Sequence, residues 1–151
     1  MHSRLARDRY FNDFFRYISN SGQFSKTRQF IQHGDTSVYS HCVAVAYVSL
    51  WFSYRLHLSV SKQSLLMGAF LHDYFLYDWH EKSDWHKWHG FSHPFRAAGN
   101  ARRIFHIGKR ERQIIESHMW PLTLRHVPET REAAIVCIAD KCCSFYETVR
   151  R

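Results

Sequence analysis

The sequence predicts an all-α fold, a single-domain bundle of about six to seven helices. Apolar residues recur at helical spacing in segment after segment, as Phe11, Phe14 and Ile18 do near the N-terminus. No segment shows the period-two alternation of a half-buried strand. The 151 residues, of which 45% are hydrophobic, are enough for one domain with a core and short for two, so residues 1–151 are predicted to form one domain.

Four helices are predicted in the first half of the chain, and a glycine or a serine marks one end of three of them. Gly34 is expected to end the short second helix. Ser37 is the predicted N-cap of the long third helix, because its hydroxyl can accept a hydrogen bond from a free backbone N–H. Ser61 begins the fourth helix, which ends with the doublet His72–Asp73. The four predicted ranges are 5–18, 25–34, 38–56 and 61–73.

Three more helices are predicted after a long loop over residues 74–91. Ser92 is the expected N-cap of the fifth helix, with Pro94 in its first turn, where proline is tolerated. Gly108 separates the fifth helix from the sixth, and Pro121 ends the sixth. The predicted ranges are 93–105, 109–120 and 131–149.

Composition excludes several classes of protein. The longest nearly unbroken apolar run, residues 42–52, has 11 residues and is too short to span a bilayer. The N-terminus is charged and has no apolar signal core, so no secretion signal is predicted. None of the four cysteines forms a CxxC pair, which favours reduced, buried thiols and a cytoplasmic location.

The charge of the chain favours an anionic partner. A formal net charge of +8 suits a small phosphorylated metabolite or a nucleotide, although a generally basic surface would give the same value. Basic residues are scattered and do not form one block, so nucleic acid is not an expected partner. No membrane association is expected, and the sequence does not specify an oligomeric state.

Residues 68–94 crowd imidazole, carboxylate and indole side chains together. From His72 to His93 there are five histidines, three aspartates, one glutamate and three tryptophans. A hydrophobic core does not favour the first two groups, and a solvated loop does not favour the third.

Six candidate metal ligands are distributed one or two to a predicted helix. Asp140 lies in the apolar segment "IVCIADKC", where an ionised carboxylate is costly unless something positive meets it. A divalent metal would do so, since imidazole nitrogen and carboxylate oxygen suit first-row metals. Taken singly, each histidine can be a hydrogen-bonded core residue, and Asp140 can pair with a basic side chain. The six candidates are His41, His72, Asp73, His93, His118 and Asp140.

The order of these residues resembles the HD-domain superfamily of metal-dependent phosphohydrolases, which are helical bundles. The resemblance covers about residues 37–147, the predicted metal-binding core. The phrases "QHGDTSVYSH", "LHDYFLYDWH", "HGFSHP" and "HMWPLT" look like a bacterial branch of this superfamily. The chain has no GYP-like segment, so hydrolysis of cyclic dinucleotides is not carried over.

The resemblance implies a metal-dependent phosphohydrolase that uses a metal-activated water on a phosphomonoester or phosphodiester. It implies one metal held by His41, His72, Asp73 and Asp140, and a second held by His93 and His118 with Asp73 bridging. The ligand types suit one or two ions of Mn, Fe, Co, Ni or Zn. Two alternatives stay open: a mixed-valent di-iron oxygenase with the same six ligands, and a non-catalytic metal-binding regulatory module.

Further residues are candidates for assisting the reaction. Asp78, His80 and His89 can bond to the ligands, act as general acid or base, or contact substrate. Arg96, Lys141 and His33 are candidates for binding phosphate or substrate, each with an ordinary surface or helix-end role as the alternative. The tryptophans of the loop can stack on a base or form a small separate core; they are Trp79, Trp85 and Trp88.

Overall fold

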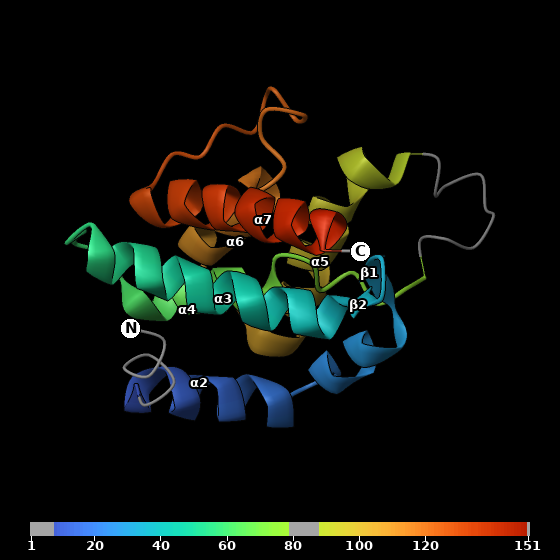
Figure 1. Cartoon of the computed structure of the whole chain (residues 1–151), viewed down its shortest axis with the longest axis horizontal. Helices are drawn as coiled ribbons and strands as arrows, with labels where there is room; N and C mark the ends of the chain where they lie inside the picture. The colour runs from blue at the N-terminus through green and yellow to red at the C-terminus, as the bar shows by residue number, and fades with distance from the viewer. Residues whose placement is uncertain (1–7, 79–87, 151) are drawn as a thin grey trace.

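Helices make up nearly all of the regular secondary structure among the described residues, which confirms the predicted all-α class. A computed structural model of the chain describes residues 8–78 and 88–150, shown in Figure 1. The elements are α2 (Arg9–Asn20), the 3-10 helix η1 (Phe24–Gln29), β1 (Ile31–His33), β2 (Thr36–Ser37), α3 (Val38–Arg55), α4 (Lys62–Leu71), α5 (His89–Phe105), α6 (Lys109–Ser117) and α7 (Arg131–Val149).

Helix α4 lies at the centre of the bundle. It packs against α3, α6 and α7, while α5 packs against α6 and α2 lies against η1 and α4. In Figure 1, α3 and α7 run side by side, and α2 lies on the other side of α3 from α7. These contacts bring side chains of α3, α4, α5, α6 and α7 close to one another.

Close approach between α4 and α6 depends on a glycine. A Cβ built on Gly68 would lie 2.9 Å from the Cβ of Ile114, closer than real side chains approach. Both residues are buried, together with Leu65, Leu66 and Phe70 on α4. The centre of α4 is apolar all round, as expected for a helix covered by neighbours on several sides.

The predicted N-cap of α3 is confirmed, and α7 begins with a side-chain cap of the same kind. Oγ of Ser37 accepts a hydrogen bond from the backbone N–H of Ser40 at 3.2 Å. Oγ1 of Thr130 accepts from the N–H of Ala133 at 3.1 Å, and α7 covers the predicted range 131–149. Each cap satisfies a backbone donor that has no partner within the helix.

The predicted second helix and the predicted absence of strands are wrong. Residues 24–29 form the 3-10 helix η1, and β1 and β2 form a two-stranded antiparallel hairpin. Gly34, with a φ of +57°, lies in the turn between the strands and does not end a helix. A left-handed glycine serves a tight turn as well as a helix end, so the sequence cue was ambiguous.

The start of α5 and the end of α6 also differ from prediction. Helix α5 begins at His89, so Ser92 is not its N-cap and Pro94 lies inside it. Proline is compatible with the first turn of a helix, which made residues 92–94 resemble a start. Helix α6 ends at Ser117, and His118 stands at its C-cap, three residues before Pro121.

No helix among the described residues is long and apolar enough to cross a membrane. All four cysteines are free, and Cys142 is exposed, unlike the buried thiols that were expected.

Candidate metal centre

All six predicted ligand side chains come together in the interior, and all are buried. They are contributed by five different helices or helix ends. His41 lies in α3, His72 and Asp73 directly follow α4, His93 lies in α5, His118 directly follows α6, and Asp140 lies in α7.

The first group consists of His41, His72 and Asp140, whose ligand atoms all lie within 4.8 Å of one another. Nε2 of His41 lies 3.1 Å from Oδ1 of Asp140 and 3.3 Å from Nε2 of His72. Nε2 of His72 lies 3.7 Å from the same carboxylate oxygen. Three ligand atoms from three helices therefore converge.

The second group consists of His93, His118 and Asp73. The Nε2 atoms of the two histidines are 2.9 Å apart, and they lie 3.2 Å and 3.5 Å from Oδ1 of Asp73. His72 also borders this group, because its ligand atom lies within 4.8 Å of those of Asp73 and His118.

Asp73 lies between the two groups and turns a different oxygen to each. Oδ1 faces the second group, while Oδ2 lies 3.4 Å from Nε2 of His72 and 3.8 Å from Nε2 of His41. A carboxylate placed in this way can bind one cation on each oxygen.

Backbone carbonyls determine which nitrogen of three histidines faces the centre. A carbonyl oxygen only accepts, so each Nδ1 carries a hydrogen and donates it. In the neutral imidazole, Nε2 then directs a lone pair toward the other ligands. The three bonds run from His72 to Ala69 (2.8 Å), from His93 to His89 (2.9 Å) and from His118 to Ile115 (2.7 Å).

Two features of the second group fit a bound cation. Oδ1 of Asp73 is buried and has no hydrogen-bond partner among the described residues. The Nε2 lone pairs of His93 and His118 face each other at 2.9 Å, a repulsive contact unless a positive species meets both. A divalent metal ion would satisfy the carboxylate oxygen and the two nitrogens together.

The carboxylates and imidazoles strongly perturb one another's pKa. Burial is the largest influence and raises the pKa of Asp73, but the charge of His72 and the contacts of His72 and His93 with the carboxylate together outweigh it and hold that pKa well below the usual range. Burial likewise raises the pKa of Asp140, but the hydrogen bond with His41 and the nearby imidazole of His72, 3.7 Å away, together outweigh it and hold that pKa well below the usual range. Burial lowers the pKa of His118 to about 3, so this ring stays neutral near pH 7. Two ionised carboxylates in the interior need positive charge, which protons or metal ions can supply.

Two largely buried side chains that the sequence analysis did not identify hold ligands in place. Nε2 of Gln32, in β1, donates a hydrogen bond of 2.6 Å to Oδ2 of Asp73. Oε2 of Glu147 accepts from Nδ1 of His41 at 2.9 Å. Glu147 lies seven residues after Asp140 and on the same face of α7, a spacing that could have identified it. No such periodicity marks Gln32, because a hairpin brings it to the site.

His89 lies beside the metal centre, against His93. The ring of His89 stacks on that of His93 with centroids 4.6 Å apart, and its Nδ1 lies 2.9 Å from the hydroxyl of Tyr77. Asp78 is half-buried, and the side chain of Trp88 is exposed. Residues 79–87 of the predicted loop lie outside the described residues, so the roles of Trp79, His80 and Trp85 stay predictions.

The three predicted substrate-binding residues are placed differently. Arg96 is exposed on α5, with its guanidinium 5.6 Å from the ring centre of Tyr77. Nζ of Lys141 donates to the backbone carbonyl of His118 at 2.9 Å, which fastens α7 to the end of α6. The backbone of His33 lies in β1, and its side chain lies outside the described part of the structure. The roles of all three in binding substrate stay predictions.

Comparison with known protein families agrees with this geometry. A family model described as HD domain matches residues 38–144, a segment that contains all six predicted ligands and most of the chain. The chain belongs to the HD domain family. No curated protein and no solved structure matches it.

Membership of the HD domain family places the protein in the superfamily of metal-dependent hydrolases. The buried histidine and aspartate groups give this HD domain a set of ligands suited to divalent metal ions.

Proposed function

We propose that this HD domain hydrolyses a phosphate ester of a small phosphorylated metabolite or nucleotide. The position of Asp73 carries the proposal, because its two oxygens face two separate groups of ligand atoms. Paired cations at such a carboxylate stabilise both the attacking and the leaving oxygen in phosphoester hydrolysis. The net charge of +8 supports an anionic small-molecule substrate.

The ligand groups assign the residues that would hold the metal ions. When bound, divalent ions supply a hydroxide near neutral pH and neutralise charge on the phosphoryl oxygens. One ion would be held by His41, His72, Asp140 and Oδ2 of Asp73, and the other by His93, His118 and Oδ1 of Asp73.

Gln32 is suited to orient the attacking water. Its Nε2 donates to Asp73, while its Oε1 is buried and has no hydrogen-bond partner among the described residues. An unsatisfied buried carbonyl oxygen is costly, and accepting a hydrogen from a water molecule would satisfy it. The amide therefore both fixes the carboxylate and offers an acceptor beside it.

His89 and Arg96 are suited to act on the substrate side of the centre. His89 is half-buried, stacks on His93 and bonds to the hydroxyl of Tyr77, so it can pass a proton to the leaving oxygen. Arg96 lies one turn after His93 on α5, where its guanidinium can bind a phosphoryl oxygen.

Metal analysis combined with phosphate release tests the proposal. Protein purified without an affinity tag is analysed for transition metals, reconstituted with Mn or Co, and assayed on a panel of phosphorylated metabolites. Asp73→Asn is expected to lose metal and activity together. Asp13→Asn, a change of the same kind at an exposed site on α2, is expected to keep both.

Three outcomes would contradict the proposal. Absence of metal uptake would remove its basis. Iron with oxygen consumption and no phosphate release would indicate the oxygenase, and bound metal without turnover on any substrate would indicate a regulatory module.

A further inference from the structure

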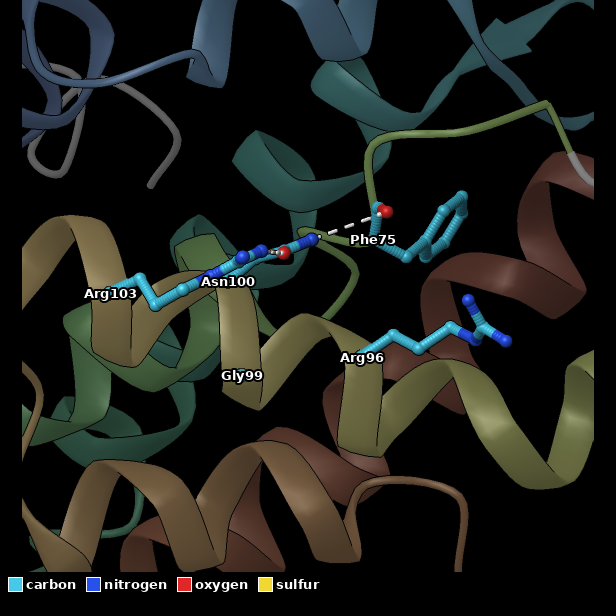
Figure 2. Close-up of a pocket in the computed structure, with 5 residues that line it drawn as sticks. All are labelled: Phe75, Arg96, Gly99, Asn100 and Arg103. Atoms are coloured by element: carbon cyan, nitrogen blue, oxygen red, sulfur yellow. Dashed lines mark hydrogen bonds between the residues drawn. The ribbon is translucent and has the colours of Figure 1, made fainter.

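A cavity of about 360 Å³ lies along α5, beside the metal centre. Phe75 connects the two, because it lines the cavity and its ring meets that of His93 edge-on, with centroids 5.8 Å apart. Figure 2 shows Phe75 with the other lining residues, which lie on one side of α5: Arg96, Gly99, Asn100 and Arg103.

Asn100 fixes the wall of this cavity. Its Nδ2 donates to the backbone carbonyl oxygens of Tyr74 at 2.9 Å and Phe75 at 3.3 Å, so the segment after Asp73 is tied to α5. Its Oδ1 accepts a hydrogen bond of 2.6 Å from Nη2 of Arg103. One side chain therefore holds both the wall and a cation in position, as Figure 2 shows.

Arg103 keeps its positive charge available to a ligand. Its partner Asn100 is neutral, and within residues 8–78 and 88–150 the guanidinium of Arg103 takes part in no ion pair. A guanidinium has five N–H donors, and the bond to Asn100 uses one of them. The group is thus oriented but not neutralised, which favours binding of an anion.

Gly99 keeps space open beside the two arginines. A Cβ built there would meet nothing within 4 Å, so packing does not require glycine at this position. Glycine inside a helix costs about 1 kcal/mol relative to alanine. Since a larger side chain would fill the lining of the cavity, the glycine is consistent with a space that a ligand uses.

We propose that this cavity binds a second anionic group of the substrate, a phosphate or a carboxylate, while the first phosphate lies at the metal centre. Arg96 and Arg103 are seven residues apart, so their Cα atoms are separated by about 10 Å along α5. The substrate class is therefore a bisphosphate, a nucleotide with more than one phosphate, or a phosphorylated carboxylic acid. The inference rests on the proposed function for the first phosphate.

Binding of phosphonates tests the second site without requiring turnover, because their C–P bond is not hydrolysed. Metal-loaded protein is titrated calorimetrically with alkylphosphonates, α,ω-alkane bisphosphonates and ω-carboxyalkylphosphonates of increasing length. At the matching length, the doubly anionic ligand is expected to bind at least about tenfold more tightly than the monophosphonate. If the bisphosphonate binds more tightly than the carboxyalkylphosphonate, the second anionic group is a phosphate; the opposite order identifies it as a carboxylate.

Three variants locate the effect. Arg103→Ala is expected to lower the ratio of the affinity for the doubly anionic ligand to the affinity for the monophosphonate about tenfold. Gly99→Leu, which improves helix propensity while filling the cavity, is expected to lower the same ratio. Arg102→Ala removes another exposed charge from α5 without changing the cavity lining, and is expected to keep the ratio.

The results separate this inference from the proposed function. Equal affinity for singly and doubly anionic ligands, or an equal loss in the Arg102 and Arg103 variants, would overturn the second site even if the protein hydrolyses phosphate esters. Preference for two anionic groups that depends on Arg103 would support the second site even if no ester is hydrolysed.

Discussion

The amide of Gln32 donates a hydrogen bond of 2.6 Å to Oδ2 of Asp73, although 41 residues separate the two in the chain. Asp73 is the carboxylate shared by both ligand groups, so its orientation decides whether each oxygen meets its histidines. The hairpin of β1 and β2 therefore places Gln32 against the candidate metal centre.

Replacing Gln32 with methionine tests this positioning role. Methionine has a similar length and no donor, so Asp73 would lose its orienting bond while the packing volume is kept. Metal affinity is expected to fall about 10- to 100-fold, as when other groups that orient metal ligands are removed. Calorimetric titration with Mn or Co measures it, and the spectrum of the Co-loaded protein reports any change of ligand geometry.

Gln63→Met is the matched control, because Gln63 is exposed on α4 and the same chemical change is made there. Equal metal affinity in the wild type and the Gln32 variant would show that the hydrogen bond to Asp73 does not hold the ligand in place.

Local signals predicted most of the fold, and the prediction was wrong where such signals were missing. Helix α7 has the bounds predicted from its helical pattern, and the structure adds a side-chain cap at Thr130. The hairpin was not predicted, because two strands of three and two residues have too few positions to show alternation. The start of α5 at His89 lacks a side-chain cap, so no residue type marks it in the sequence.

The residues of the candidate site also fall into those that the sequence predicted and those that it did not. Its six predicted ligands were found through the order of residues that resembles the HD-domain superfamily. Gln32 and Asn100 were not found, because each acts through a contact with a distant segment. Asn100 bonds to backbone carbonyls at Tyr74 and Phe75, and no sequence spacing encodes such a contact.

Proton release on metal binding is expected from His41. Burial is the largest influence and lowers its pKa, but hydrogen bonds with Asp140 and Glu147 outweigh it and raise the pKa to about 10. The unfolded chain has a histidine pKa near 6.5. Without metal, the folded protein thus holds a proton on His41 at pH 7 to 9 that the unfolded chain does not.

This proton makes both the metal affinity and the stability of the metal-free protein depend on pH. A metal ion must displace that proton, so metal affinity is expected to rise by up to about tenfold for each pH unit between about 7 and 10. The stability that the proton gives to the metal-free protein is complete below about pH 6.5 and is lost as the pH rises through about 10. Calorimetry in buffers of different ionisation enthalpy measures the released protons. A binding enthalpy that is independent of the buffer would contradict the prediction.

Two helix glycines should respond to alanine in opposite directions. At Gly68 a Cβ would collide with Ile114, so Gly68→Ala is expected to destabilise the fold by about 1–3 kcal/mol. At Gly99 a Cβ meets open space, so Gly99→Ala is expected to stabilise the fold by up to about 1 kcal/mol. Chemical denaturation of both variants measures the free energy of unfolding. If both variants lose stability, the prediction that alanine is tolerated at Gly99 but not at Gly68 is wrong.

His93 and His118 decide whether this HD domain holds one metal ion or two. Neither belongs to the group of His41, His72 and Asp140, and both turn Nε2 toward the otherwise unpartnered Oδ1 of Asp73. In a His93→Ala, His118→Ala double variant, the first group keeps all its ligand atoms while the second loses both nitrogens. Metal content is therefore expected to fall from two ions to one, with most phosphate release lost. Elemental analysis, calorimetric stoichiometry and parallel assays measure this, and circular dichroism checks that the helices remain.

The matched control replaces two exposed histidines, His57 and His126, with asparagine, which tolerates the positive φ of +51° at His57. This control is expected to bind as much metal as the wild type, because neither side chain lies among the ligand groups. If the His93, His118 variant keeps the wild-type stoichiometry, its two histidines are structural residues of the core and the centre is mononuclear. If it holds one ion where the wild type holds two, Oδ1 of Asp73 and these two nitrogens form the second metal site.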